Sequence, residues 1–248
     1  MGLKVLILVL LVVCVGGCGS FASQLSNDNG MPIETVSDDI EVETVEVFDD
    51  EKSVPDFDRS DILAMNRGNL EFSWQFNQHG NLRHINGKFS NITINSPEDA
   101  LMALYSIRSL TGISDPKNSF SFRQESVNVQ GGGRSYSFNQ VHNGVRVERR
   151  TLFIRTDMDG VANFLDLSYE YRIAINTTPS ISQRRAEAIA RAELGDDWGF
   201  VDVELIIRLP RQNYDNFRLI WMLNDGEGST VVDAQSGEFL GWHSRLIQ

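Results

Sequence analysis

The alternation of apolar and polar residues is clearest between Tyr136 and Tyr171. Two turn signals interrupt it, one at residues 142–144 (His-Asn-Gly) and one at residues 157–160 (Asp-Met-Asp-Gly). Alternation with period two gives a β-strand one buried face, and Asn-Gly or Asp-Gly supplies the positive φ angles of a tight hairpin. The pattern therefore predicts three consecutive antiparallel strands, and the rest of the chain is interpreted around them.

Similar patterns on either side predict the remaining elements. A helix is expected to begin at Pro97, with Ser96 as its N-cap, and to end at Gly112, because Ser caps free amides and Pro suits the first helical position. A second helix, capped by Ser182, ends at Gly195. The expected strands flanking the three central ones are 70–76, 82–89, 120–130, 201–209, 217–223, 230–232 and 239–247. These elements predict an α+β fold of two small domains, each a helix packed on an antiparallel sheet.

The first eighteen residues have the features of an export signal. Lys4 precedes an apolar run from Val5 to Val15, which is shorter than the about 20 apolar residues of a membrane-spanning helix. Val15-Gly16-Gly17-Cys18 resembles the lipobox of bacterial lipoproteins, in which the cysteine carries the lipid. We expect residues 1–18 to be a lipoprotein signal peptide with Cys18 as the lipid anchor. Simple cleavage near Gly19 or Ala22 is the alternative.

The expected cellular location follows from the same export signal. A lipid on Cys18 places the protein in the cell envelope, held on a membrane and facing the periplasm or the exterior. The residue after the cysteine is Gly19 rather than Asp, which favours the outer membrane if the source is Gram-negative.

Negative charge is concentrated behind the signal. Residues 19–61 hold thirteen acidic residues against Lys52 and Arg59, which accounts for −11 of the chain's net charge of −12. Like charges repel, and little apolar surface offsets the entropy of ordering, so we expect an acidic disordered tether over 19–61. The part from Ile62 onward is nearly neutral and lacks the basic face that a nucleic-acid-binding protein needs.

Residues that carry catalytic or metal chemistry are few. Both cysteines, Cys14 and Cys18, lie in the export signal, so the folded part has neither a disulfide nor a reactive thiol. The sequence contains no His-Glu-x-x-His, no Gly-x-Ser-x-Gly and no P-loop. His79 and His84 flank a predicted turn, where surface histidines are the default and a metal site is the alternative. We expect no enzyme activity, no cofactor and no metal.

Several motifs carry a resemblance to known families. In the first half they are Ile85–Phe89, Ser-Pro-Glu at 96–98, the block Phe138–Val147, and Leu-x-Ile-Arg followed by Asp-x-Asp-Gly-Val at 152–161. This half, taken as 62–178, resembles the fungalysin/thermolysin propeptide (FTP) domain. In the second half they are Ile181–Ala190, Leu219–Met222 and Val231–Leu240. This half, 179–248, resembles a PepSY domain.

The resemblance implies a role and a partner. In these families the two domains stand in tandem as propeptides of secreted zinc metallopeptidases, as chaperone and inhibitor. It implies here a non-catalytic protein that binds a secreted metallopeptidase. The alternative is a surface structural or small-ligand-binding lipoprotein module unrelated to peptidases.

The partner-binding residues are expected where the chain departs from the family pattern around Asn143-Gly144. His142 and Arg146 stand where relatives have an aromatic residue and Pro, and Glu148 stands where Gly is common. We therefore expect His142, Asn143, Arg146 and Glu148 to contact the partner.

Overall fold

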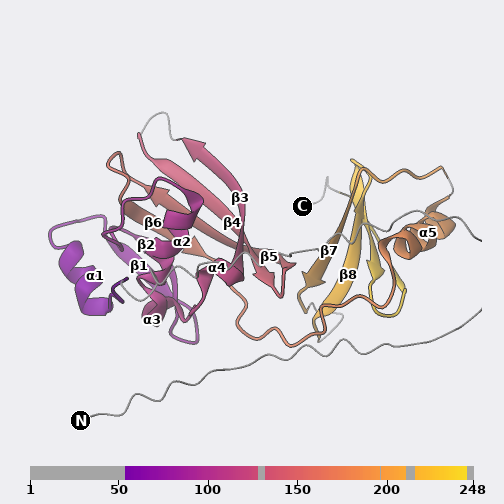
Figure 1. The fold of residues 1–248 in the computed structure, drawn as a ribbon, viewed down its shortest axis with the longest axis horizontal. Helices are drawn as coiled ribbons and strands as arrows, with labels where there is room; N and C mark the ends of the chain where they lie inside the picture. The colour runs from indigo at the N-terminus through magenta and orange to yellow at the C-terminus, as the bar shows by residue number, and fades with distance from the viewer. Residues whose placement is uncertain (1–53, 128–131, 196, 211–215, 245–248) are drawn as a thin grey trace, which may run out of the picture. The chain divides into compact units, whose positions relative to one another are not determined.

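The structure is a computed structural model of the chain. It describes residues 54–127, 132–195, 197–210 and 216–244, which all fall within one compact unit, Val47–Gln248 (Figure 1). The predicted signal peptide, Cys18 and most of the predicted tether lie outside the described residues. Within the described ranges, no helix combines the length and the apolar character needed to cross a membrane.

The folded body begins before the predicted boundary at Ile62. Helix α1 (Arg59–Met65) is capped by Asp58, whose carboxylate accepts hydrogen bonds from the amides of Ser60 and Asp61. The Asp61 carboxylate accepts from the Asp58 amide in return, at 2.9 Å. Ile62 is fully buried in the core. The predicted end of the tether at residue 61 is therefore wrong, because a capped helix with a buried side chain already starts there.

Antiparallel strands form the first part of the sheet, in the order β1-β2-β6-β5-β4-β3. They are β1 (Ser73–Phe76), β2 (Leu82–Asn86), β3 (Phe120–Val127), β4 (Arg134–His142), β5 (Val145–Thr156) and β6 (Ala162–Leu167). The three predicted central strands are β4, β5 and β6. The β4–β5 turn has two residues, Asn143 and Gly144, and both have a positive φ (49° and 78°), as the Asn-Gly signal predicts.

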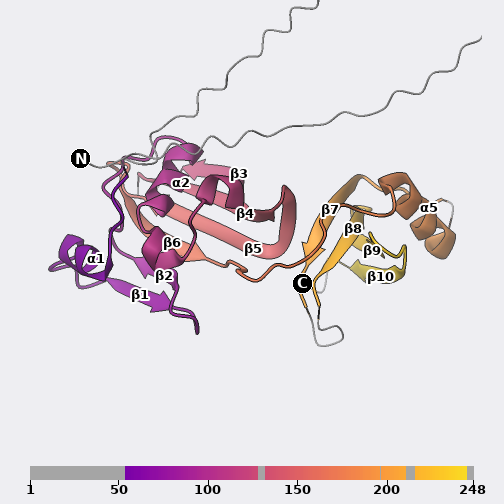
Figure 2. The same cartoon turned by 60° about the horizontal axis from the view of Figure 1, so that its bottom comes forward.

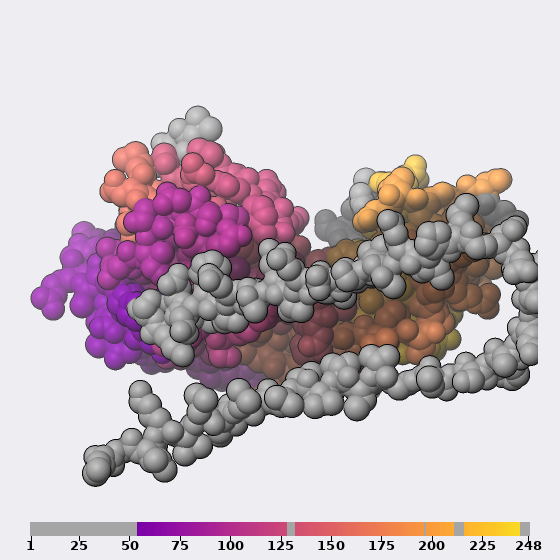
Figure 3. All heavy atoms as spheres, in the orientation of Figure 1, coloured from indigo at the N-terminus to yellow at the C-terminus, as the bar shows by residue number. Residues whose placement is uncertain are grey.

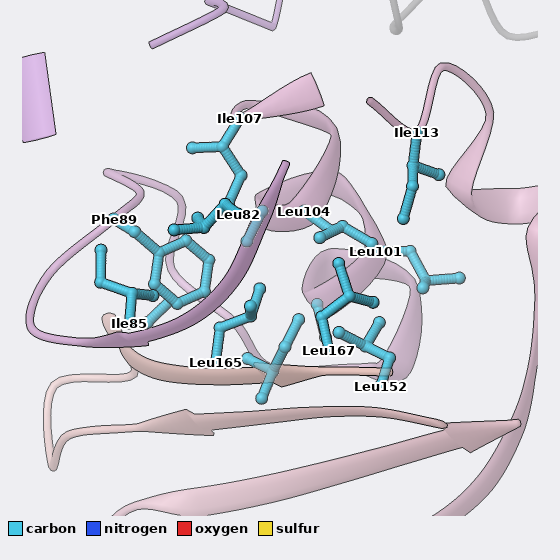
Figure 4. Close-up of a cluster of buried hydrophobic side chains, with 14 of the residues drawn as sticks. Leu82, Ile85, Phe89, Leu101, Leu104, Ile107, Ile113, Leu152, Leu165 and Leu167 are labelled. Atoms are coloured by element: carbon cyan, nitrogen blue, oxygen red, sulfur yellow. The ribbon is translucent and has the colours of Figure 1, made fainter. Parts of the chain in front are cut away.

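Short helices cover one face of these strands: α2 (Pro97–Tyr105), α3 (Arg108–Thr111) and α4 (Pro116–Ser119). Figure 4 shows the cluster between them and the sheet, in which Leu101, Leu104 and Ile107 lie opposite Leu152 and Leu165. All five side chains are buried, and such a core is the main source of stability in a domain without a disulfide. The core therefore holds α2 on the sheet.

The second part follows the predicted order of one helix and several strands. Helix α5 (Gln183–Leu194) is capped by Ser182 and packs with Ala186 and Ala190 on Leu223 and Val232. Figure 2 shows this helix beside the strands of the second part. The strands are β7 (Asp202–Arg208), β8 (Arg218–Asn224), β9 (Gly228–Asp233) and β10 (Phe239–Ser244), all antiparallel to their sequence neighbours. The predicted α+β class is confirmed.

One strand, β5, joins the sheets of the two predicted domains. Its first residues pair in parallel with β7, at Arg146↔Ile206 and Val147↔Ile207, so the strands form one ten-stranded sheet. Opposite Gln140 of β4, β5 bulges over residues 147–150, and Arg149 has a φ of 55° there. A bulge of this kind bends a strand. Strand β5 pairs with β7 at Arg146 and Val147, where the bulge begins, and with β6 after it.

Candidate partner-binding surface

The four residues predicted to contact a partner lie together in the β4–β5 hairpin. Asn143 is exposed at the tip, and His142 beside it is partly buried. The His142 Nε2 and Asn143 Nδ2 atoms are 3.5 Å apart, which is too long for a strong hydrogen bond. These two side chains are thus available at the turn.

Arg146 points to the second half of the chain. Its Nε and Nη2 atoms donate to the two carboxylate oxygens of Glu204 on β7, both at 2.6 Å. This two-point contact, helped by the nearby negative charge, raises the pKa of Arg146 above its usual value. A guanidinium held in this way fits a carboxylate with fixed geometry. The charge of Arg146 is therefore used within the chain.

Glu148 also faces β7. Its Oε2 atom is 3.7 Å from the Nε atom of Arg208, whose side chain is only 4% exposed. The distance makes an ion pair without a hydrogen bond at this atom, and the Arg208 Nε has no hydrogen-bond partner. A buried guanidinium needs a negative neighbour, because leaving its charge alone in the interior is costly. Glu148 supplies that charge at the junction of β5 and β7, and its expected contact with a partner stays a prediction.

A second candidate surface, which the sequence did not single out, is the edge strand β3. Among the described strands it pairs with β4 alone. Every residue from Ser121 to Val127 is exposed, and Phe122 and Val127 keep 50% and 62% of their surface open. The atoms of this region lie at the outer surface in Figure 3. An edge strand presents unpaired N–H and C=O groups, so β3 can pair with an extended polypeptide.

Side-chain contacts attach β3 to β4, and other features of the strand limit unselective pairing at its edge. The Arg134 guanidinium on β4 contacts Glu125 at 2.6 Å, and the rings of Phe122 and Phe138 meet edge to face at 5.8 Å. A register shift between Phe122 and Gln124 bends the strand, and such bulges and charges limit unselective pairing. With eight residues, β3 is longer than the edge strands β1 (four) and β10 (six). The polar run from Arg123 to Ser126, which interrupts the alternation that predicts this strand, is a sequence signal that β3 lacks a buried face.

The histidines show no metal arrangement within the described residues. The His84 Nδ1 atom is 3.8 Å from a carboxylate oxygen of Asp166, and its ring meets Phe164 edge to face at 5.0 Å. His79 is exposed in the β1–β2 turn beside Gln78. Over the described ranges, no group of three or more His, Cys, Asp or Glu side chains is placed to hold a metal ion.

Comparisons with known proteins assign no family. No family model matches the chain, and no curated protein matches it. Among solved structures, the chain is similar to the Bacillus megaterium YpeB C-terminal domain, with a TM-score of 0.37 and 10% identity. The match covers 77% of this chain and 98% of that one. A likeness at this level carries no argument about function. The functional argument therefore rests on the surfaces described above.

Proposed function

We propose that this protein is a non-catalytic exported module that binds a secreted metallopeptidase, as an inhibitor or a folding chaperone. The single observation that carries the proposal is the exposed edge of β3. An eight-residue strand that is open along its length can add a strand from a partner, with main-chain hydrogen bonds supplying affinity. The resemblance of the two halves to FTP and PepSY propeptide domains supports the choice of partner.

The proposal includes a docking geometry. An extended segment of the peptidase pairs with the outer edge of β3, and its apolar side chains cover Phe122 and Val127. Both side chains are open in the structure, and burying such side chains contributes roughly 25 cal/mol per Å² of apolar surface. His142 and Asn143 at the β4–β5 turn are a second contact, which the resemblance to the FTP domain suggests.

The test is to mix the purified protein with thermolysin-like peptidases of the same organism. Complex formation is measured by size-exclusion chromatography and calorimetry, and peptidase activity is followed with a peptide substrate. An inhibitor lowers the activity of the folded peptidase, whereas a chaperone raises the yield of active enzyme after refolding. No complex and no change in activity or refolding yield with any of these peptidases removes the proposal.

A matched pair of variants tests the role of β3. Val127→Lys places a charge on the edge strand, and Val201→Lys makes the same change at a site that is 76% exposed outside β3. We expect Val127→Lys to weaken the complex about tenfold and Val201→Lys to leave it unchanged. Equal affinity of the two variants would move the docking site away from β3.

Location in the cell envelope is part of the proposal. A lipid on Cys18 would hold the module at a membrane surface, where it meets exported peptidases. Cys18→Ser should release the protein into the soluble fraction. Unchanged membrane fractionation of this variant would count against the lipid anchor, while leaving the binding proposal in place.

A further inference from the structure

A polar hollow of about 330 Å³ lies at the end of the first part of the sheet, away from the residues of β3. The end of α1, the loop before β1, the end of β2 and the neighbouring ends of β5 and β6 surround it. Its charged and amide lining consists of Arg67, Asn69, Glu71, Lys88, Arg155 and Asn163, together with neighbouring residues. This volume is at the lower end of the range for small-molecule sites.

The lining is positively charged. It contains three cations, Arg67, Lys88 and Arg155, and one acid, Glu71, which gives a net charge of 3 − 1 = +2. Within the described residues, none of these three side chains forms an ion pair. Cations that share a hollow repel each other, and an anion bound among them removes that repulsion and gains charge-assisted hydrogen bonds. The hollow therefore favours an oxyanion.

One of the cations, Arg155, and the backbone that carries a second, Lys88, are held in position. The Arg155 guanidinium lies 4.7 Å above the ring of Phe164, a contact that orients it. The Asn66 amide donates to the Lys88 carbonyl at 2.7 Å and accepts from the Lys88 amide at 2.8 Å. The same amide group donates to the Ile62 carbonyl at 2.8 Å, which ties α1 to this point. Because these groups are already held in place, less conformational entropy is lost when a ligand binds.

An unsatisfied atom adds a second requirement. The Asn163 Oδ1 atom is buried and has no hydrogen-bond partner. A buried acceptor without a donor costs about 1–3 kcal/mol, and a fully deprotonated anion cannot supply the donor. A hydroxyl group of a ligand can supply it when the Asn163 side chain turns toward the hollow. The exposed amide of Asn69 and the partly buried amide of Asn86 line the same hollow and can bond further hydroxyls.

We infer that this hollow is a binding site for a small polyhydroxylated anion, such as a sugar phosphate or a sugar acid. The cations bind the phosphate or carboxylate, and Asn163 accepts from a neighbouring hydroxyl. The site does not depend on the peptidase partner or on β3, so its failure leaves the proposed function untouched.

The experiment measures binding to the full folded chain by calorimetry, with four probes. Glucose 6-phosphate and glucuronate carry both charge and hydroxyls, sulfate carries charge without an O–H donor, and glucose carries hydroxyls alone. We expect the first two to bind, sulfate to bind at least about fivefold more weakly, and glucose not to bind. A rise from 0.05 to 0.5 M NaCl should weaken binding, because salt screens the cations.

Matched variants locate the site. Arg155→Gln and, separately, Arg67→Gln should each weaken glucose 6-phosphate about tenfold, while Arg184→Gln removes an exposed guanidinium on α5 and should change nothing. Arg67 is exposed, so its variant tests the site even if Arg155→Gln fails to fold. Two results overturn the inference. One is that neither sugar anion binds at ligand concentrations from about 1 to 10 mM. The other is that all three variants lose affinity for glucose 6-phosphate equally. Equal affinity for sulfate and glucose 6-phosphate overturns the hydroxyl requirement.

Discussion

At the residue scale, Gly87 shows how closely the chain packs around Asn66. Its φ is +141°, and a Cβ atom at this position would lie 2.5 Å from the Asn66 Oδ1 atom and 2.6 Å from a ring carbon of Phe72. Both atoms belong to side chains that are held in place, Asn66 by three hydrogen bonds. A side chain at residue 87 therefore strains the backbone and disturbs the link between α1 and β2.

This packing yields a stability prediction. Gly87→Ala should lower the free energy of unfolding by about 2–4 kcal/mol, because it combines an unfavourable φ with a steric clash. The measurement is urea denaturation followed by circular dichroism. Gly199→Ala is the control, since a Cβ atom there meets nothing within 4 Å, and it should change stability by less than about 0.5 kcal/mol. Equal stability of the two variants would contradict the prediction.

Tyr171 gives a pH prediction. Burial raises its pKa to about 12, and its hydroxyl donates to the Thr111 carbonyl at 2.7 Å. An acid whose pKa is higher in the folded state stabilises the fold fully below its unfolded pKa, near 10. That contribution is lost as the pH rises from about 10 through about 12. The loss should amount to at most about 2 kcal/mol, because Tyr171 is partly exposed.

The check is denaturation at pH 9, 10 and 11 for the natural chain and for Tyr171→Phe. The variant loses the bond to Thr111 and should be less stable at pH 9, but its stability should fall less between pH 9 and 11. Tyr105→Phe, at a partly exposed tyrosine at the end of α2, is the control. Parallel curves for the natural chain and Tyr171→Phe would show that Tyr171 does not cause the loss.

At the element scale, the ion pairs between β5 and β7 should stabilise the junction. The Arg146–Glu204 contact is two-pronged and only partly exposed, at 24% and 36% of the side chains. In a double-mutant cycle with Arg146→Ala and Glu204→Ala we expect a coupling energy of about 1 kcal/mol. The pair Glu187–Arg191, one turn apart on α5 at 3.5 Å, is the comparison and should give about 0.3 kcal/mol. A coupling at Arg146–Glu204 no larger than on α5 would contradict the prediction.

The elements themselves were largely predictable, and the exceptions have physical causes. Ser96 and Ser182 predicted the starts of α2 and α5, because capping is a local interaction between residues three apart. The predicted helix up to Gly112 was wrong in one respect, since it breaks after Tyr105 into α2 and α3. There the Ser106 hydroxyl donates to the Ala103 carbonyl at 2.7 Å, a side-chain bond that competes with the helix.

The candidate site was less predictable than the elements. The turn at Asn143-Gly144 follows from two neighbouring residues, whereas the partners of Arg146 and Glu148 lie on β7, near residues 204 and 208. Nothing local in the sequence indicates such a pairing. The open edge of β3 has the same origin, because an edge is a property of strand order and not of the strand's own residues.

At the scale of the whole molecule, the two predicted domains share part of a core. Val147 of β5 packs with Ile207, Leu219 and Ala234 of the second half, and Ile173 and Ile175 from the connection join them. The first half has its own cluster, built around α2 and the sheet. Residues 179–248 therefore depend on β5 for part of their apolar burial, while the reverse dependence is smaller.

This asymmetry predicts the behaviour of the halves expressed alone. A fragment of residues 54–178 should fold cooperatively, because its central core is complete within it. A fragment of residues 179–248 loses Val147, the parallel pairing of β5 with β7 and the charge of Glu148 beside the buried Arg208. It should expose Ile207 and Leu219, bind a hydrophobic dye and unfold at a lower denaturant concentration than the same residues in the full chain.

A longer fragment tests whether the missing contacts of β5, and not the fragment's short length, destabilise the second half. A fragment of residues 134–248 restores β4, β5 and the connection, and should recover the folding of the second half. The variant Val147→Asp in the full chain should loosen β7 and β8 first, as seen by amide hydrogen exchange, because the buried charge has no partner there. If residues 179–248 alone fold as stably as in the full chain, the second half is an independent domain. The contacts of β5 with β7 would then only orient it.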